Sequence, residues 1–346
     1  MELTQRPADP FTLRFRIVEL LRPVVGFDRW CWPACDPGSG LGTTAVGDHD
    51  YWPLVPRLLL LDQRLDAADA LPMLVAARAR GGRDVGLRFL DVLGPTGIGD
   101  ELRVPLRDKH GLWGCLDLMR SSDDPPFSEE DRDLLDALVP ALAAVTRRST
   151  AASPSGGGAP PPPAGVLVLD ADLNVRASTA GARAWLAQLV PANLPFAELA
   201  ALAVVFNVAS RVLARPTAAS RPGAPHTQLP ARSRVRSMTG GWAVVEADAL
   251  DPLDSTVAVT IRPAAASEIL DLRFLAYDLT ARERELVSLL LDGSDTRTVS
   301  KRLFLSPHTV QDHLKSIFGK TGVRTRKELV ATLASTEATS SLGIED

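Results

Sequence analysis

Residues 149–164, STAASPSGGGAPPPPA, divide the chain into parts that cannot belong to one continuous pattern of helices and strands. Small residues, glycine and proline dominate this stretch, and no apolar period runs through it, so it cannot pack a core. The run of four prolines favours an extended, semi-rigid spacer. We therefore predict a linker over 149–164, with separately folding domains on either side in this chain of 346 residues.

The composition is that of an ordinary folded protein, because 45% of the residues are hydrophobic and 23% are charged. No apolar run reaches the ~18 residues that a membrane span needs, and the N-terminus lacks an apolar signal core. The chain has three cysteines, so no disulfide framework is expected. These features predict a cytoplasmic protein that has no membrane partner.

The segment before the linker begins with an expected amphipathic helix over 11–25, whose apolar side chains have helical spacing. Those side chains are Phe15, Val18, Leu20 and Leu21. Strands are expected next at FDRWCW and at LRVPLRDKHGLWGCLDLMR. Within the second of these, Lys109-His110-Gly111 separates two apolar runs and predicts the turn of a β-hairpin.

A second helix is expected over FSEEDRDLLDALVPALAAVTRR, with Ser128 as its cap and acidic residues in its first turn. Its predicted buried face consists of Leu134, Leu135, Leu138, Val139 and Leu142. The order of helix, strands, glycine-rich loops, strands and closing helix resembles an α+β sensor domain of the GAF type over 11–148. The resemblance implies a GAF-like domain over 1–148 and an unknown small-molecule ligand within it.

The segment after the linker has the pattern of a second α+β domain. A strand at 166–169, a turn at 170–174, a short strand and a helix from about Ala180 resemble the opening of a PAS domain. Later strands are expected at RSRVRSMTGGWAVVEADAL and at STVAVTIRPA. The resemblance implies a PAS-like domain over 165–268. The following joint, 262–278, has apolar residues at near-helical spacing, so we expect a helix that packs either against this second domain or against the domain that follows it.

Three short helices are expected towards the C-terminus. The first has Thr280 as its cap and Glu283 in the capping-box position, and Gly293 ends it. The segment TRTVSKRLFL predicts a brief second helix, in which a small residue lets another helix cross closely. Ser306 and Pro307 are typical of the start of a third helix.

The third helix has two contrasting faces. Its predicted buried stripe consists of Val310, Leu314, Ile317 and Phe318. Its opposite face carries His308, Gln311, Asp312, Lys315 and Gly319. Glutamine, aspartate and lysine on one helix face suit the major groove of DNA, where they can read the donors and acceptors of base edges.

The charge pattern points to the same partner. Between Arg297 and Lys327, eight Lys and Arg residues stand against one Asp, although the whole chain has a formal net charge of −4. A cationic surface on an otherwise acidic protein favours a polyanion, and lysines and arginines around the third helix would neutralise phosphates.

These residues also carry a resemblance to the LuxR-type helix-turn-helix family, over 275–333. The matching positions are Leu279-Thr280, Arg282-Glu283, Gly293, Leu303, Ser306, Thr309-Val310, His313, Ile317, Lys320, Gly322-Val323, Arg326 and Leu329. Val299-Ser300 replaces the usual Ile-Ala, and Thr321 replaces the usual Leu.

The LuxR-type resemblance implies an all-α DNA-binding domain over 269–334, followed by a tail over 335–346. It implies binding to double-stranded DNA as a homodimer and regulation of transcription together with RNA polymerase. By resemblance, Thr309, Lys320 and Arg324 contact phosphates, while Gln311, Asp312 and Lys315 face bases. The full expected DNA-binding set is His308, Thr309, Gln311, Asp312, Lys315, Lys320, Arg324 and Arg326.

Two features of the C-terminal segment allow two interpretations each. His313 lies between the buried and exposed faces of the third helix, so it can approach a phosphate or pack in the core. In the last expected helix, Leu329, Val330 and Leu333 lie on one side. This stripe can complete the domain core or pair with a second copy, and we expect it to contribute to a dimer.

Other motifs have a plain explanation and a more specific one. The loop DPGSGLGTT, residues 36–44, could cradle a phosphate, but it lacks the strand-to-helix context and reads better as a loop. Cys31, Cys35 and His49 lack the spacing of common zinc sites. The tryptophans of the expected strands could line a ligand cavity but are core residues first. They are Trp30, Trp32 and Trp113.

No catalytic motif or cofactor motif appears, so we predict neither an enzyme nor a bound cofactor. The sequence thus predicts a transcriptional regulator whose N-terminal sensor domains modulate a C-terminal LuxR-type domain. One alternative is that the N-terminal domains receive their input by associating with another protein. Another is an enzyme that the last domain tethers to DNA.

Overall fold

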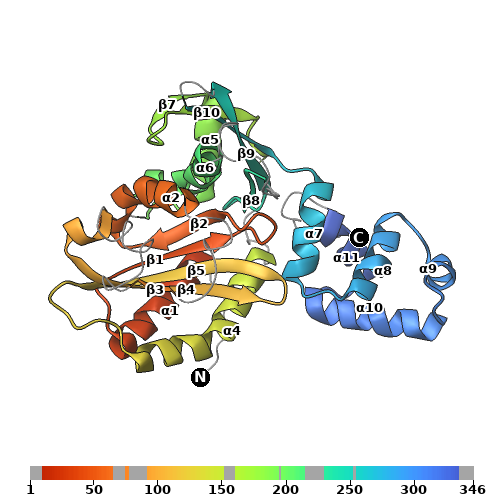
Figure 1. Cartoon of the computed structure of the whole chain (residues 1–346). Helices are drawn as coiled ribbons and strands as arrows, with labels where there is room; N and C mark the ends of the chain where they lie inside the picture. Colours follow the sequence, from red (N-terminus) through yellow and green to blue (C-terminus); the bar gives the residue numbers. More distant parts are fainter. Residues whose placement is uncertain are drawn as a thin grey trace, which may run out of the picture.

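The computed structural model describes residues 10–64, 75–77, 92–151, 160–194, 196–214, 230–251 and 255–334. Two sheet domains and a small helical domain are arranged around one helix, α7 (Ala266–Ala276), near the centre of the molecule (Figure 1). We call these parts the first sheet domain (10–151), the second sheet domain (160–263) and the helical domain (279–334). None of the described helices is long and apolar enough to cross a membrane.

The first sheet domain is built on a five-stranded antiparallel sheet with the order β2-β1-β5-β4-β3. Its elements are α1 (Pro10–Val25), β1 (Arg29–Cys35), β2 (Gly42–Gly47), the 3-10 helix η1 (His49–Leu54), α2 (Val55–Arg64), β3 (Val75–Ala77), the 3-10 helix η3 (Gly94–Thr96), β4 (Ile98–Asp108), β5 (Gly111–Ser121) and α4 (Glu129–Ala151). Figure 1 shows α1 and α4 together on one side of this sheet. The expected hairpin is confirmed, because β4 and β5 pair from Asp108 and Gly111 onwards.

Both predicted helices of this domain form, with three corrections. Leu20 is 74% exposed and Leu134 is 37% exposed, so neither belongs to the buried face. A helix that lies on a sheet buries only the side chains on the face that contacts the sheet, and these two lie outside that face. The helix α4 also runs on to Ala151, through the first residues of the predicted linker. Residues 152–159 of that linker lie outside the described residues. Ser128 caps α4 as expected, since its hydroxyl accepts from Asp131 N at 3.1 Å.

The second sheet domain repeats the same strand arrangement, with the order β7-β6-β10-β9-β8 and antiparallel pairing throughout. Its elements are β6 (Gly165–Leu169), β7 (Val175–Ser178), α5 (Ala180–Leu189), α6 (Ala197–Leu213), β8 (Arg232–Arg236), β9 (Trp242–Asp251) and β10 (Thr256–Pro263). The expected turn at 170–174 forms because Asp170 Oδ1 accepts from the backbone N–H groups of Asp172 and Asn174.

The helix α6 joins the two sheet domains, and the sequence pattern did not predict it. Its buried side chains occupy nearly every position from Ala200 to Val212. It packs against α2 and β2 of the first sheet domain, and Asn207 Oδ1 accepts from Gly42 N at 3.2 Å. The buried apolar residues of both sheet domains consequently form one continuous core. The two sheets are therefore parts of a single packed body.

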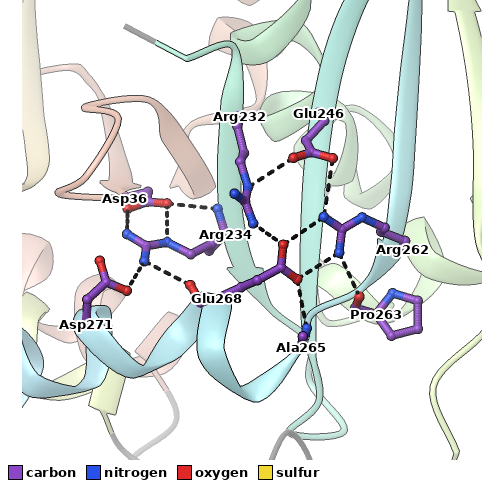
Figure 2. A network of polar contacts seen from close by, with 9 residues as sticks. All are labelled: Asp36, Arg232, Arg234, Glu246, Arg262, Pro263, Ala265, Glu268 and Asp271. Atoms are coloured by element: carbon purple, nitrogen blue, oxygen red, sulfur yellow. Dashed lines mark hydrogen bonds and ion pairs between the residues drawn. The ribbon is translucent and has the colours of Figure 1, made fainter.

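Polar contacts fix the start of α7 to the second sheet domain, as Figure 2 shows. Glu268 accepts from Arg232, from Arg262 and, at 2.8 Å, from the backbone N–H of Ala265. The hydrogen bond from Arg262, with these other contacts, lowers the pKa of Glu268 to about 2. The first turn of α7 is thereby held by ion pairs and a cap at the same time.

Arg234 extends this network to the first sheet domain (Figure 2). Its guanidinium is 9% exposed and donates to both carboxylate oxygens of Asp36, at 2.8 and 2.7 Å. The third nitrogen donates to Asp271 of α7 at 2.6 Å and to the Glu268 carbonyl at 3.1 Å. Trp113 of the first sheet domain and Trp242 of the second also pack with Ile269 and Leu272 of α7. The expected helix in the joint 262–278 is confirmed, and it contacts every domain.

The helical domain has its own core, which is separate from that of the sheet domains. Its helices are α8 (Ala281–Leu291), α9 (Thr296–Leu303), α10 (Pro307–Thr321) and α11 (Arg326–Ala334). The predicted caps are confirmed: Thr280 and Glu283 form a capping box, and the Ser306 hydroxyl accepts from Thr309 N at 3.1 Å. Gly293 follows α8 in the left-handed conformation with φ 82°.

Glu283 connects the start of α8 to the end of α10. It is 3% exposed, and its carboxylate accepts from Thr280 N, Ser316 Oγ and Lys320 Nζ, each at 2.7 Å. Burial alone would raise the pKa of Glu283, but these hydrogen bonds, led by that of Lys320, lower it to about 2. The ionised carboxylate is therefore part of what holds the helices together.

Replacing Gly165 by alanine is expected to destabilise the fold. A Cβ at this position would lie 2.0 Å from Ala182 N, because β6 passes directly against the first turn of α5. The substitution Gly165→Ala should lower the free energy of unfolding by about 1–3 kcal/mol, measured by urea denaturation. Gly319→Ala is the control, since no atom lies within 4 Å of the added Cβ and the site is helical. It should stabilise by about 0.5–1 kcal/mol. Equal stability of Gly165→Ala and the unchanged chain would contradict this packing.

Glu283 should make the stability of the helical domain depend on acid pH. Its folded pKa of about 2 lies below the ordinary value of 4.5, so its contribution is complete above pH 4.5 and is lost as the pH falls towards 2. The loss should reach up to about 3 kcal/mol. Glu283→Gln should be less stable at neutral pH and should show a flatter dependence between pH 5 and 2. The exposed Glu285, which pairs with Arg282, supplies the matched control Glu285→Gln. The same acid dependence in both variants would argue against this role.

Candidate nucleic-acid interface

The helix α10 presents a polar face to solvent. His308, Gln311, Asp312 and Lys315 are all exposed. On the opposite side, Val310, Leu314 and Ile317 are buried in the core of the helical domain, and Phe318 is half-buried. The polar face stays exposed because the apolar residues recur at helical spacing and pack in the core that α10 shares with α8, α9 and α11. A rigid helix with donors and acceptors on its free side is the element that fits a major groove.

The start of α10 is fixed by a side-chain cap. Ser306 caps the helix, and its hydroxyl lies 2.8 Å from Thr309 Oγ1. Thr309 is half-buried, whereas His308 is exposed in the first turn. His308 Nε2 lies 3.7 Å from a carboxylate oxygen of Asp312, one turn further on. The pair is solvent-exposed, so it is weak and leaves both side chains free to turn to another partner.

The predicted cationic residues fall into two groups. Lys315 and Arg324 are exposed, and the backbone N–H of Arg324 donates to Glu328 at 2.8 Å. Lys320 instead donates to Glu283 at 2.7 Å and to the Asp278 carbonyl at 3.0 Å. Arg326 is half-buried and donates to the Ser294 carbonyl. The structure thus brings six predicted residues to the surface of the α10 region without an ion pair to the core, while the exposed Lys320 and the half-buried Arg326 are bonded to other parts of the domain.

The charges of α9 were evident from the sequence, but the position of the end of this helix beside α10 was not. Lys301 and Arg302 are exposed there, directly before the turn that leads into α10. Phe304, in that turn, is 94% exposed and has the left-handed φ of 53°. Their position between a short helix and the Ser306 cap was a local signal that could have identified them. His313 is half-buried, between the two faces of α10.

The stripe on α11 completes the core of the domain in this structure. Leu329 and Leu333 are fully buried, and Val330 is half-buried. The helix α7 packs against α11, and Arg273 of α7 donates to the Leu333 carbonyl at 2.9 Å. Of the two interpretations that the sequence allowed for this stripe, core packing is therefore realised here. A second copy could reach the side of α11 that α7 covers only if α7 moved.

The first sheet domain holds a buried polar cluster on one face of its sheet. Cys115 Sγ lies 3.1 Å from Asp117 Oδ1, and Asp117 pairs with Arg103 at 3.3 Å. Burial, followed by the charge of Asp117, raises the pKa of Cys35 to about 12, and the same causes raise the pKa of Cys115 well above its ordinary value. These raised pKa values favour the protonated thiols, which are poor nucleophiles.

The glycine-rich loop, the cysteines and the tryptophans of the first sheet domain form ordinary loop and core structure. Within 36–44, Gly38 N and Gly40 N donate to Asp36, so these N–H groups are not available to a phosphate. Cys31 and Cys35 are buried, and the described residues contain no group of three or more His, Cys, Asp or Glu that could hold a metal. The three tryptophans of the first sheet domain are buried: Trp30, Trp32 and Trp113.

The two ends of the chain match known families. Residues 278–333 match the family described as bacterial regulatory proteins, luxR family. Residues 12–145 match the GAF domain. Of the three resemblances expected from the sequence, those to the LuxR-type family and to the GAF domain are thereby confirmed. The first match covers the helical domain, and the second covers nearly all of the first sheet domain.

Three bacterial relatives are similar to this chain over a short stretch. A protein of Mycobacterium bovis whose name describes an HTH-type transcriptional regulator is 44% identical over 52 residues, 15% of this chain and 6% of the relative. The monoamine regulon transcriptional regulator of Klebsiella aerogenes is 43% identical over 53 residues, 15% of this chain and 23% of the relative. The spore germination protein GerE of Bacillus subtilis is 38% identical over 55 residues, 16% of this chain and 74% of the relative.

The extent of these matches differs greatly. The chain spans about 6% of the length of the mycobacterial relative, so that protein as a whole is no guide to this one. It spans 74% of the length of GerE. With the luxR match over the capped helices α8 to α11, this likeness shows that the chain belongs, through its helical domain, to the luxR family of bacterial regulatory proteins.

Proposed function

We propose that the protein is a sequence-specific DNA-binding transcriptional regulator whose sheet domains modulate its helical domain. One observation carries the proposal: α10 exposes His308, Gln311, Asp312 and Lys315 on one face while its other face is buried. These side chains supply donors and acceptors at the spacing that a major groove requires. Membership of the luxR family supports the same assignment.

The residues divide into those that read bases and those that hold the backbone. Lys315 donates to guanine, Gln311 pairs with adenine and Asp312 accepts from cytosine, which are the pairings that the geometry of base edges favours. Thr309 and Arg324 contact phosphates, with His308 beside them. Lys320 and Arg326 also belong to the proposed interface. Since each has a partner inside the domain, their first role is to orient the ends of α10 and α11.

Two copies bind one operator, which contains two related half-sites about one helical turn apart. The site of action is the cytoplasm, where the bound dimer acts with RNA polymerase. No enzymatic step is part of this function. Its input enters through the domains before α7, whose boundaries we place at 1–148 and 165–268 with the linker 149–164 between them. The DNA-binding domain occupies 269–334, and 335–346 forms a tail.

The two sheet domains are the proposed receivers of the signal. The match of 12–145 to the GAF domain supports a small-molecule sensor in the first of them. A PAS-like assignment for the second is supported by its five antiparallel strands and by its strand order, β7-β6-β10-β9-β8, with a helix pair between β7 and β8. The core that the sheet domains share would pass a change in one domain to the other.

The deciding experiment is to map, across the genome of the native cell, the DNA that the protein binds. The recovered sequences supply the operator for measurements with purified protein. Lys315→Ala should weaken binding to this operator by about 1–3 kcal/mol and relax the preference at one base position. Binding can be measured by fluorescence anisotropy on the operator and on a scrambled duplex of equal length.

Arg324→Ala is the matched control, because it also removes one exposed cation from the same domain. As a phosphate contact, it should weaken the operator and the scrambled duplex alike and lower the slope of log K against log salt by about one. If Lys315→Ala weakened both duplexes equally, or neither, α10 would not be the element that reads the bases.

A further inference from the structure

Asp278 lies at the point where α7 ends and the helical domain begins. It has a left-handed backbone with φ 56°, a conformation that non-glycine residues adopt at some energetic cost and that aspartate tolerates better than most. Such a conformation persists only where surrounding contacts hold it. Here the contacts come from two different domains.

The side chain of Asp278 is held by the β4–β5 hairpin of the first sheet domain. Lys109 Nζ lies 2.7 Å and His110 Nε2 lies 2.6 Å from the same oxygen, Asp278 Oδ1. Lys109 is mostly exposed, which weakens its ion pair, whereas the His110 side chain is 9% exposed. Although burial raises it, the hydrogen bonds from Lys109 and His110 lower the pKa of Asp278 to about 2.

The hairpin is itself fixed in the position from which it reaches Asp278. Asp108 accepts from His110 N and from Trp113 Nε1, both at 2.8 Å. Asp108 also pairs with Arg147 of α4 at 2.9 Å. Arg147 in turn donates to the carbonyl of Ala276, the last residue of α7, at 2.9 Å. The first sheet domain thus holds the end of α7 and the residue after it.

The backbone carbonyl of Asp278 points to the helical domain and accepts from Lys320 Nζ at 3.0 Å. Lys320 belongs to the last turn of α10, the helix that carries the proposed DNA-reading face. One residue therefore contacts the sensor with its side chain and the DNA-binding domain with its carbonyl.

The segment 277–280 is where the helical domain can turn. The first half of α7 is held by Glu268 and Asp271 in the network of Figure 2. The helices α8 to α11 share one core, so we expect them to move as one unit. A rotation of this unit relative to α7 must then occur between α7 and α8, and it would separate α11 from α7. Only such a separation uncovers the side of α11 that faces α7, where Arg273 donates to the Leu333 carbonyl.

We propose that Asp278 is a latch through which the first sheet domain holds the DNA-binding domain in its low-affinity position. While His110 and Lys109 hold Asp278, α7 covers α11 and a second copy cannot pair there. Release of Asp278 lets the helical domain turn, uncovers α11 and permits two copies to bind the operator. The inference rests on the proposed function, since it needs dimeric binding to DNA. It assigns Asp278 and His110 a positioning role that acts through α7.

The test uses full-length protein with Asp278→Asn, His110→Ala and the double variant. Asparagine tolerates the left-handed backbone and removes only the charge, so the fold should survive. Operator affinity is measured by anisotropy, and self-association by sedimentation equilibrium, both without added signal. Each single variant should bind the operator about 5- to 150-fold more tightly, the usual range of coupling between sites. Dimers should appear at correspondingly lower concentration.

Two controls separate this effect from others. Asp292→Asn removes the same charge from an exposed position of the helical domain, so it reports what loss of one negative charge does to DNA binding. The double variant should bind no more tightly than Asp278→Asn, because both changes break one contact. A merely structural role would lower affinity and melting temperature, whereas the latch predicts a gain in affinity.

The proposal is overturned if both single variants bind the operator no more tightly than the unchanged chain. It is also overturned if Asp292→Asn gives the same gain, or if the two gains add. Lys315→Ala, made in the Asp278→Asn protein, tests the proposed function separately. If Lys315→Ala abolishes the preference for the operator while Asp278→Asn has no effect, DNA reading by α10 stands and only the latch fails.

Discussion

The buried guanidinium of Arg234 is the interaction on which the arrangement of the domains depends. A charge that is 9% exposed needs ionic partners, and removing one partner from a buried pair typically costs about 3–5 kcal/mol. The partners of Arg234 come from a loop of the first sheet domain and from α7. Its charge is therefore satisfied only when both sheet domains and α7 have come together. Gly38 makes room for this contact, since a Cβ there would lie 2.7 Å from the guanidinium.

Packing divides the chain into two cooperative bodies rather than three. The sheet domains share one apolar core, to which α6 contributes from the second and Trp52 from the first. The helical domain has a core of its own, and Phe274 of α7 is part of it. Because α7 is bonded to the sheets at its start and packed with the helices at its end, it belongs to both bodies. A change of state in the sheets can thus reach the DNA-binding domain through one short helix.

Much of the helical domain could be predicted from the sequence, because its determinants are local. The capping residues Thr280, Glu283 and Ser306 lie within one helical turn of the groups that they cap, and Pro307 directly follows Ser306. The spacing of Val310, Leu314 and Ile317 defines which face of α10 is exposed. The spacing of apolar residues did not predict α6, since a helix that is apolar on all sides shows no hydrophobic periodicity. It could not foresee the Asp36–Arg234 pair, whose members are 198 residues apart. Nor could it foresee that Lys320 pairs with Glu283, because the two residues are 37 positions apart and meet only after folding.

The three cysteines offer a practical consequence for anyone who wishes to follow this molecule in motion. Cys31, Cys35 and Cys115 are all buried. Because the thiolate is the reactive form, the raised pKa values of Cys35 and Cys115 make these two slow to react with maleimides or nitroxide reagents. A cysteine introduced on the outer face of α9 and another on the β4–β5 hairpin would therefore take up a dye pair selectively, with no need to remove the natural thiols. The folded chain is thus suited to spectroscopic measurements of the distance between two introduced labels.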